Sequence, residues 1–125
     1  MPRYLRAMKA FSTRGIAAHY YLTKDFKRGL AFYRDVVGLP IAAKSGRHAE
    51  FELPDGSTFG LSFMPDLWYP GGGVMFEVDD IGAAIDRLKA AQVRFFTDGA
   101  LETEECRVAW CEDTEGNNFA VHARK

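Results

Sequence analysis

The chain repeats one pattern of secondary structure twice. Two segments carry apolar residues at helical spacing, DFKRGLAFYRDVVGLP over residues 25–40 and DDIGAAIDRLKAAQV over residues 79–93. Each follows a short apolar strand, IAAHYYLT or GVMFEV, and each precedes three strand-like pieces. A unit of this size that occurs twice in 125 residues is too long and too rarely repeated for a solenoid. The repeat therefore indicates two halves related by duplication.

Both predicted helices have recognisable ends. Asp25 and Asp80 occupy N-cap positions, where a carboxylate accepts a hydrogen bond from a free backbone N–H group. Gly38 followed by Pro40 ends the first helix. Lys89 lies in the last turn of the second, where a cation suits the helix dipole.

Short strands fill the rest of each half. PIAAKSG, HAEFELP and STFGLSF follow the first helix, and the last two are joined by the turn residues Pro54-Asp55-Gly56. VRFFT, RVAWCE and NNFAVHA follow the second helix. The proline and glycine residues of MPDLWYPGGG indicate a linker. We expect an α+β fold in a single domain over residues 1–125, with module one at about 15–64, a linker at 65–72 and module two at about 73–124.

Composition excludes several classes of partner. A hydrophobic content of 47% in 125 residues is enough for one domain with a real core. The net charge of −1 arises from 16 basic and 17 acidic residues spread along the chain, which predicts no nucleic-acid or anionic-membrane partner. No apolar run approaches the roughly 20 residues that span a bilayer. MPRYLRAMKAF lacks the features of a secretory signal, so we expect a cytoplasmic protein.

Cys106 and Cys111 suit a reducing compartment. They are five residues apart in CRVAWC, which has the character of one strand. Their side chains therefore leave opposite faces and cannot form a disulfide with each other. We expect two reduced thiols and no metal or redox pair.

Three motifs occur in order on the duplicated pattern. They are a helix motif D-x6-F-Y-x4-G-L that starts at Asp25, V-D-D-I at residues 78–81 and E-D-T-E-G-N at residues 112–117. With these motifs the chain resembles the vicinal oxygen chelate superfamily, which contains glyoxalase I, extradiol dioxygenases, fosfomycin resistance enzymes and bleomycin resistance proteins. The resemblance covers residues 16–124. It implies two tandem βαβββ modules that form an open, curved, eight-stranded mixed sheet around a ligand cavity, usually completed in a homodimer.

The resemblance also implies where metal ligands would lie. In metal-dependent members, His and Glu residues occupy the first and last strand of each half, at positions that correspond to Ala18, Gly60, Gly73 and Ala120 here. None of these residues offers a donor atom. We therefore expect no metal and no cofactor, and a cavity widened by four small residues. In this respect the chain resembles the metal-free, drug-sequestering members of the superfamily.

An alternative places histidine ligands near these positions. His122 lies two residues beyond Ala120 and so on the same strand face. His19 would need a bulge to reach the face of Ala18, because a shift of one residue reverses the side-chain direction. His48 lies in a strand that carries no ligand in the superfamily pattern. A histidine-based metal site thus remains open as a second interpretation.

Strand alternation predicts the residues that face the cavity. Glu77 is expected on the cavity face, where it could pair with a cationic ligand or act as a general base. The structural alternative is that its carboxylate reaches water or pairs with Arg87. Glu50 and Glu52 are expected to face solvent. Trp68 and Tyr69 in the linker form either a lid over the core or a binding platform. The candidate ligand-binding residues from this alternation are Tyr20, Leu22, Ser62, Met75, Glu77 and His122. Trp68 of the linker and Trp110, whose side chain could lie on either face of its strand, complete the candidate set.

Two functions fit this cavity. The first is a metal-free small-molecule binding protein of the glyoxalase/bleomycin-resistance type, with a largely apolar or aromatic ligand in the cup of the sheet and a homodimer as the assembly. The alternative is a lyase, isomerase or dioxygenase of the same superfamily that uses His122 and Glu77, with or without a metal. Nucleophilic catalysis has no support, because no serine or cysteine stands in a recognisable motif.

Overall fold

The computed structural model describes residues 10, 12 and 14–125, so the expectation drawn from the first eleven residues lies almost wholly outside it. The first half contains β1 (His19–Thr23), α2 (Phe26–Ala31), the π-helical segment η1 (Phe32–Val37), β2 (Ile41–Lys44), β3 (His48–Glu52) and β4 (Thr58–Phe63). The second half contains β5 (Val74–Glu77), α3 (Ile81–Ala90), β6 (Leu101–Glu102), β7 (Cys106–Glu112) and β8 (Asn118–Arg124).

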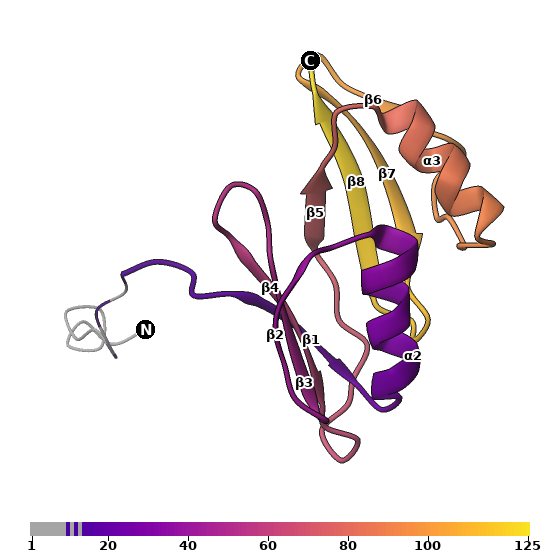
Figure 1. Cartoon of the computed structure of the whole chain (residues 1–125). Helices are drawn as coiled ribbons and strands as arrows, with labels where there is room; N and C mark the ends of the chain where they lie inside the picture. Colours follow the sequence, from indigo (N-terminus) through magenta and orange to yellow (C-terminus); the bar gives the residue numbers. More distant parts are fainter. Residues whose placement is uncertain (1–9, 11, 13) are drawn as a thin grey trace, which may run out of the picture.

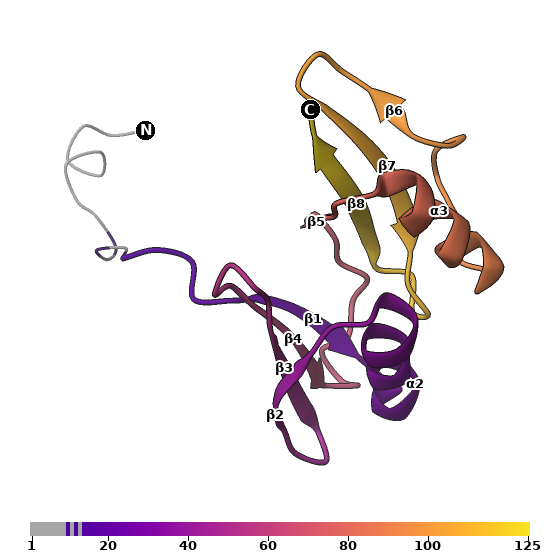
Figure 2. The same ribbon diagram turned by 45° about the horizontal axis from the view of Figure 1, so that its top comes forward.

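The two halves have the same topology. Their strand orders are β1-β4-β3-β2 and β5-β8-β7-β6, and in each sheet the first pair is parallel while the others are antiparallel. The α+β class and the tandem βαβββ modules are thereby confirmed, with the eight strands divided into two mixed sheets of four. Figures 1 and 2 show the sheets as separate layers at an angle to each other, with α2 near their junction.

The expected helix ends are also present. Asp25 Oδ1 accepts a hydrogen bond from Arg28 N at 3.1 Å, and Asp80 Oδ1 accepts one from Ala83 N at 3.0 Å. Gly38 ends the first helix with a positive φ of 85°, which glycine adopts without steric cost. Before that point the helix widens from α2 into η1, and the consecutive side chains of Phe32 and Tyr33 are both buried.

One expected strand is absent. Residues 93–97, VRFFT, pair with β7 only through an isolated bridge between Phe95 and Cys111. The ladder stops there because the hydroxyl of Thr97 accepts the N–H of Trp110, at 3.3 Å, and itself donates to the carbonyl of Gly99. A side chain thus replaces the next backbone partner. The outer strand is instead the two-residue β6, farther along the chain.

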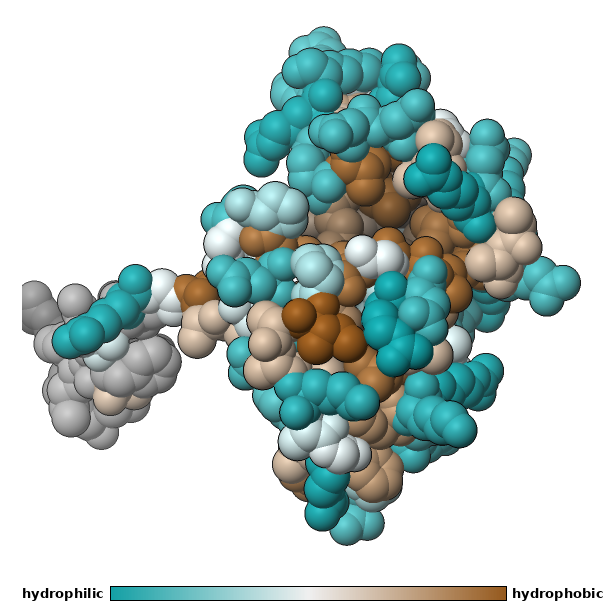
Figure 3. Space-filling model, in the orientation of Figure 1, coloured by the Kyte–Doolittle hydropathy of each residue, from teal (hydrophilic) through white to brown (hydrophobic). Residues whose placement is uncertain are grey.

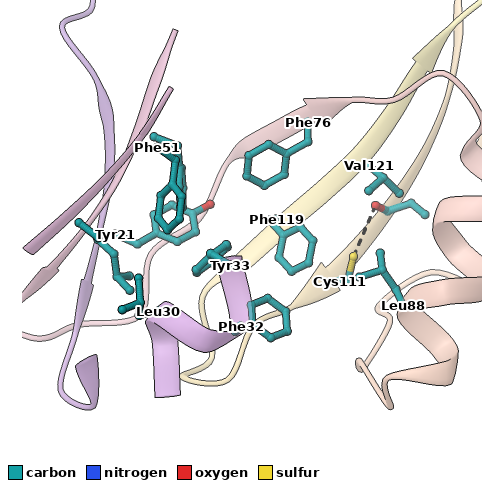
Figure 4. Close-up of a cluster of buried hydrophobic side chains, with 14 of the residues drawn as sticks. Tyr21, Leu30, Phe32, Tyr33, Phe51, Phe76, Leu88, Cys111, Phe119 and Val121 are labelled. Atoms are coloured by element: carbon teal, nitrogen blue, oxygen red, sulfur yellow. Dashed lines mark hydrogen bonds between the residues drawn. The ribbon is translucent and has the colours of Figure 1, made fainter. Parts of the chain in front are cut away.

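The core joins the two halves through aromatic rings. Phe59 of the first sheet and Phe76 of the second have ring centroids 5.5 Å apart, and Phe32 lies 5.9 Å from Phe119. Figure 4 shows side chains from both sheets converging on this cluster. Cys111 is also buried here, whereas Cys106 is half-buried and both thiols are free. One face of each sheet is therefore used for the shared core, and the opposite face of each remains open.

The E-D-T-E-G-N motif connects the halves by hydrogen bonds. Asp113 accepts hydrogen bonds from the Tyr33 hydroxyl at 2.6 Å, the Asn117 side-chain amide at 2.8 Å and two backbone N–H groups. Glu115 accepts the backbone N–H groups of Lys24 and Asp25 at the start of the first helix. Burial and the Asp113 carboxylate raise the pKa of Tyr33 well above its usual value, so the hydroxyl stays a donor. The motif has a structural role here.

Apolar surface reaches the outside of the molecule around the junction of the halves, while polar residues cover both ends (Figure 3). Within residues 14–125 no helix is long and apolar enough to cross a membrane.

Candidate functional site

The strand register assigns the candidate residues to two separate open faces. On the first sheet, Tyr20 and Glu50 both lie beside Gly60, and Leu22 and His48 both lie beside Ser62. On the second sheet, Met75 and Trp110 flank Ala120 in one row, and Glu77 and Val108 flank His122 in the next. Residues in register across a sheet share a face. Each open face thus carries part of the predicted set.

The open face of the second sheet is largely apolar. Met75 is 46% exposed, and Leu101, beside Val108 on the outer strand, is 50% exposed. Trp110 is half-buried. Phe96 follows the same edge of the sheet, because its N–H bonds the carbonyl of Trp110, and it is 51% exposed. Such a surface offers area for an apolar ligand and one polar pair for orientation.

That polar pair is Glu77 and His122. His122 Nδ1 and Glu77 Oε1 lie 2.6 Å apart, and the backbone N–H of Arg124 donates to Glu77 Oε2 at 2.9 Å. The Arg124 N–H and His122 lower the pKa of the Glu77 carboxyl, so it is ionised at neutral pH. The His122 side chain is 15% exposed and that of Glu77 is 54% exposed. Glu77 therefore reaches water, as one of the two predicted alternatives had it, but its side-chain partner is His122 and not Arg87.

The open face of the first sheet carries a polar cluster that the sequence analysis missed. The Tyr20 hydroxyl donates to Glu50 Oε1 at 2.8 Å and lies 2.8 Å from His48 Nε2, and the Tyr20 and His48 rings stack with centroids 5.2 Å apart. Burial, followed by the hydrogen bond to Glu50, raises the pKa of Tyr20 to about 12. Glu52 is exposed as expected, but Glu50 lies in this cluster. The sequence did contain a signal for this cluster, because the apolar residues Ala49 and Phe51 alternate with polar ones and are buried in the core. Alternation then places His48 and Glu50 on the opposite face, which is the face of Tyr20.

The cavity is not emptied at Gly60. The Tyr20 ring lies over this glycine, and a Cβ atom there would overlap the ring. The space that a larger residue would occupy is thus filled by the chain's own tyrosine. Ala120, the equivalent position of the second sheet, is fully buried. The expectation that small residues widen the cavity is wrong at these two positions.

Gly73 has a different reason for being glycine. Its φ is 99°, in the region that side chains with a Cβ rarely adopt, and no atom lies within 4 Å of a Cβ built there. Its N–H donates to the Asn118 side chain at 3.1 Å, which fixes the turn into β5. Backbone conformation, not space for a ligand, therefore accounts for this residue. A leucine there would strain the backbone, so Gly73 does not support the expectation of a cavity widened by small residues.

A divalent metal does not fit the residues at the superfamily's ligand positions. Ala18 precedes β1, Gly73 precedes β5, and Gly60 and Ala120 present no donor to the open faces. Among residues 14–125 no group of three or more His, Cys, Asp and Glu side chains is close enough to hold an ion. His122 and Glu77 supply two potential donors on one sheet, fewer than protein zinc sites use.

Trp68 packs against Lys24, and no hydrogen bond or ring stacking joins it to the other candidate residues within the described part of the chain. Lys24 Nζ is 4.2 Å from the centroid of its ring, and its Nε1 is buried with no partner in the described residues. A groove of about 390 Å³ does adjoin the first open face, lined by His48, Ser62, Met64 and Leu67 among others. The structure thus brings Tyr20, Leu22 and Ser62 together on one face and Met75, Glu77, Trp110 and His122 on the other.

Comparisons with known proteins agree with this architecture. The family model described as the Glyoxalase/Bleomycin resistance protein/Dioxygenase superfamily matches residues 16–121. Many solved structures share the fold. Lactoylglutathione lyase from Agrobacterium tumefaciens is 18% identical with a TM-score of 0.74, covering 89% of this chain and 94% of that chain.

TnmS3, an antibiotic binding protein from Streptomyces sp. CB03234, is 23% identical with a TM-score of 0.71, covering 94% of this chain and 100% of that chain. A glyoxalase/dioxygenase from Nostoc punctiforme is 14% identical with a TM-score of 0.77, covering 94% of this chain and 99% of that chain. No curated protein matches the sequence. At these identities the solved structures establish a shared fold.

Proposed function

Because the chain belongs to the glyoxalase/bleomycin resistance protein/dioxygenase superfamily, we propose that it binds a small, largely apolar or aromatic molecule on the open face of its second sheet. The observation that carries the proposal is the composition of that face, where Trp110 and Met75 lie in the row beside the Glu77–His122 pair. Broad apolar contact with few fixed polar groups is typical of small-molecule sites. The similarity to an antibiotic binding protein supports the same class of function.

We propose that this binding needs no metal. The four positions that would supply ligands are Ala18, Gly60, Gly73 and Ala120, and a hydrogen or methyl side chain has no lone pair to share. The Tyr20 ring over Gly60 also occupies the place of one such ligand. The two free thiols are compatible with the cytoplasmic location that the sequence predicts.

Replacing Trp110 with alanine tests the binding surface. The change removes the largest aromatic side chain of the second open face, so the affinity for an aromatic ligand found by screening should fall at least about tenfold, or ~1.4 kcal/mol. Ligand-observed NMR titration measures this without relying on tryptophan fluorescence. Tyr69→Ala is the matched control, because Tyr69 is 79% exposed in the linker. Unchanged affinity in Trp110→Ala, or loss of wild-type binding on adding EDTA, would contradict the proposal.

We further propose that the protein acts as a homodimer. The open faces expose apolar side chains on both sheets, among them Met64, Met75, Phe96 and Leu101. Contiguous apolar surface of this kind is usually covered by a partner, and two-fold pairing of identical chains is the commonest arrangement. Light scattering at micromolar concentration should report twice the mass of the 14.0 kDa chain. A single species at the monomer mass would refute this assembly.

An enzyme that works without a metal is the second candidate. It is favoured by one observation, the 2.6 Å contact between Glu77 and His122, which holds the imidazole in the way that a general base is oriented. The binding titration distinguishes the two functions. A binding protein returns its ligand unchanged, whereas conversion of the ligand that is lost in His122→Gln would identify the chain as a lyase or isomerase.

A further inference from the structure

We propose that the ligand of the second open face is a hydroxylated aromatic molecule, whose hydroxyl group donates a hydrogen bond to His122 Nε2 while its ring lies against Trp110. This inference rests on the proposed binding function and names the chemical class of the ligand. It is carried by the contacts of Glu77 and His122 and by a comparison between the two sheets of the same chain.

The contacts of Glu77 determine which nitrogen of His122 is free. One carboxylate oxygen is 2.6 Å from His122 Nδ1, and the other accepts the N–H of Arg124 at 2.9 Å. An ionised carboxylate only accepts hydrogen bonds, so Nδ1 carries the proton that it donates. In a neutral imidazole the other nitrogen, Nε2, then bears the lone pair. Nε2 has no hydrogen-bond partner within residues 14–125 and is available to accept one from a ligand.

The same contacts make a cationic ligand less suitable. Each oxygen of Glu77 already accepts a hydrogen bond from the protein, so part of its charge is compensated before a cation arrives. The pKa of Glu77 is lowered, first by the Arg124 N–H and then by His122, which shows that the protein already stabilises its charge. Glu77 therefore acts as a positioning residue for His122, and the ligand forms its hydrogen bond with the histidine.

The first sheet contains a phenol in a comparable setting. There the Tyr20 hydroxyl donates its single proton to Glu50 and accepts from Nε2 of His48, 2.8 Å away. A histidine and a glutamate thus hold a phenol on the open face, with the phenol proton directed at the glutamate. In the second sheet, by contrast, the glutamate is already paired with His122 and leaves the histidine as the acceptor. Met75 occupies the position of the second sheet that corresponds to Tyr20, since Tyr20 pairs with Gly60 and Met75 with Ala120. The second sheet thus has a histidine–glutamate pair without a phenol from the protein.

The neighbouring row supplies the surface for the ring. Trp110 lies two residues from Val108 along β7, and Val108 is directly beside His122, so the indole and the imidazole share one face in adjacent rows. Residues two apart on a strand are separated by roughly 7 Å. A bicyclic aromatic molecule is long enough to place its hydroxyl at Nε2 and its far ring over Trp110 or Met75.

Two probes that differ only in whether their oxygen carries a hydrogen or a methyl group test the inference. 2-Naphthol donates a hydrogen bond, and 2-methoxynaphthalene does not. Ligand-observed NMR titration of the wild-type protein should give at least about tenfold tighter binding for 2-naphthol than for 2-methoxynaphthalene. The methoxy probe covers His122 Nε2 without offering it a hydrogen-bond donor. In Glu77→Gln and in His122→Phe this preference should fall to within about twofold, while 2-methoxynaphthalene binds as it does to the wild type.

Controls separate this inference from the proposed function. His19→Gln changes an exposed strand histidine of the other sheet and should keep the wild-type preference, and circular dichroism verifies that each variant is folded. Equal affinities of the two probes for the wild type would overturn the hydroxyl inference and leave the binding function intact. Failure of both probes to bind at millimolar concentration would instead overturn both.

Discussion

Replacing Asp113 with alanine should lower the free energy of unfolding by about 3–4 kcal/mol. The carboxylate accepts hydrogen bonds from the Tyr33 hydroxyl, the Asn117 amide and two backbone N–H groups of its own turn. Tyr33 and Asn117 are 0% and 1% exposed, so neither can turn to water when the carboxylate is lost. Each buried polar group left without a partner costs about 1–3 kcal/mol. Urea denaturation followed by circular dichroism measures the change.

The control for this change is Asp66→Ala, because Asp66 is an exposed residue of the linker. It should alter stability by no more than about 0.5 kcal/mol, as surface substitutions usually do. Tyr33→Phe should lose less than Asp113→Ala, because it removes one of the four donors and leaves the other three in place. If Asp113→Ala destabilised the protein no more than Asp66→Ala, the motif would not hold the halves together.

Replacing Phe59 with alanine should cost about 3–5 kcal/mol of unfolding free energy. This ring lies at the centre of the shared core, with centroid distances of 4.8 Å to Tyr33, 5.2 Å to Tyr21 and 5.5 Å to Phe76. Its removal leaves a cavity lined by rings from both halves, and β4 cannot move to close it while it is paired on both sides. Thermal and urea denaturation measure the loss.

Phe96→Ala is the matched control, since the same side chain is removed from a site that is 51% exposed. A loss of less than about 1 kcal/mol is expected there. Similar losses for the two variants would show that the aromatic cluster does not carry the stability assigned to it. A single cooperative transition in wild type and both variants would be consistent with halves that unfold together.

Local signals in the sequence were sufficient for the elements and their order. Asp25 and Asp80 cap their helices through side-chain contacts with residues three positions away, and Gly38 ends a helix through its own φ. Alternation along each strand likewise follows from the pleat, so Met75 and His122 could be assigned to one face before their neighbours were known, although His48 and Glu50 were missed. The duplication and the motifs were enough to identify the superfamily, which the family match confirms.

Partners across the fold were decided by tertiary structure. Tyr20 covers Gly60 and bonds Glu50, 30 positions along the chain, so a space that the sequence presents as empty is filled. Thr97 takes the N–H of Trp110 and ends a ladder that strand propensity favours. Gly73 looks like the other small residues in the sequence, yet its φ of 99° is set by the turn into β5. Helix caps and strand alternation depend on near neighbours in the chain, whereas the occupant of a surface position depends on which strands pair and in which register. For this reason Glu77 and His122, 45 residues apart, became a pair only when β5 and β8 were placed side by side.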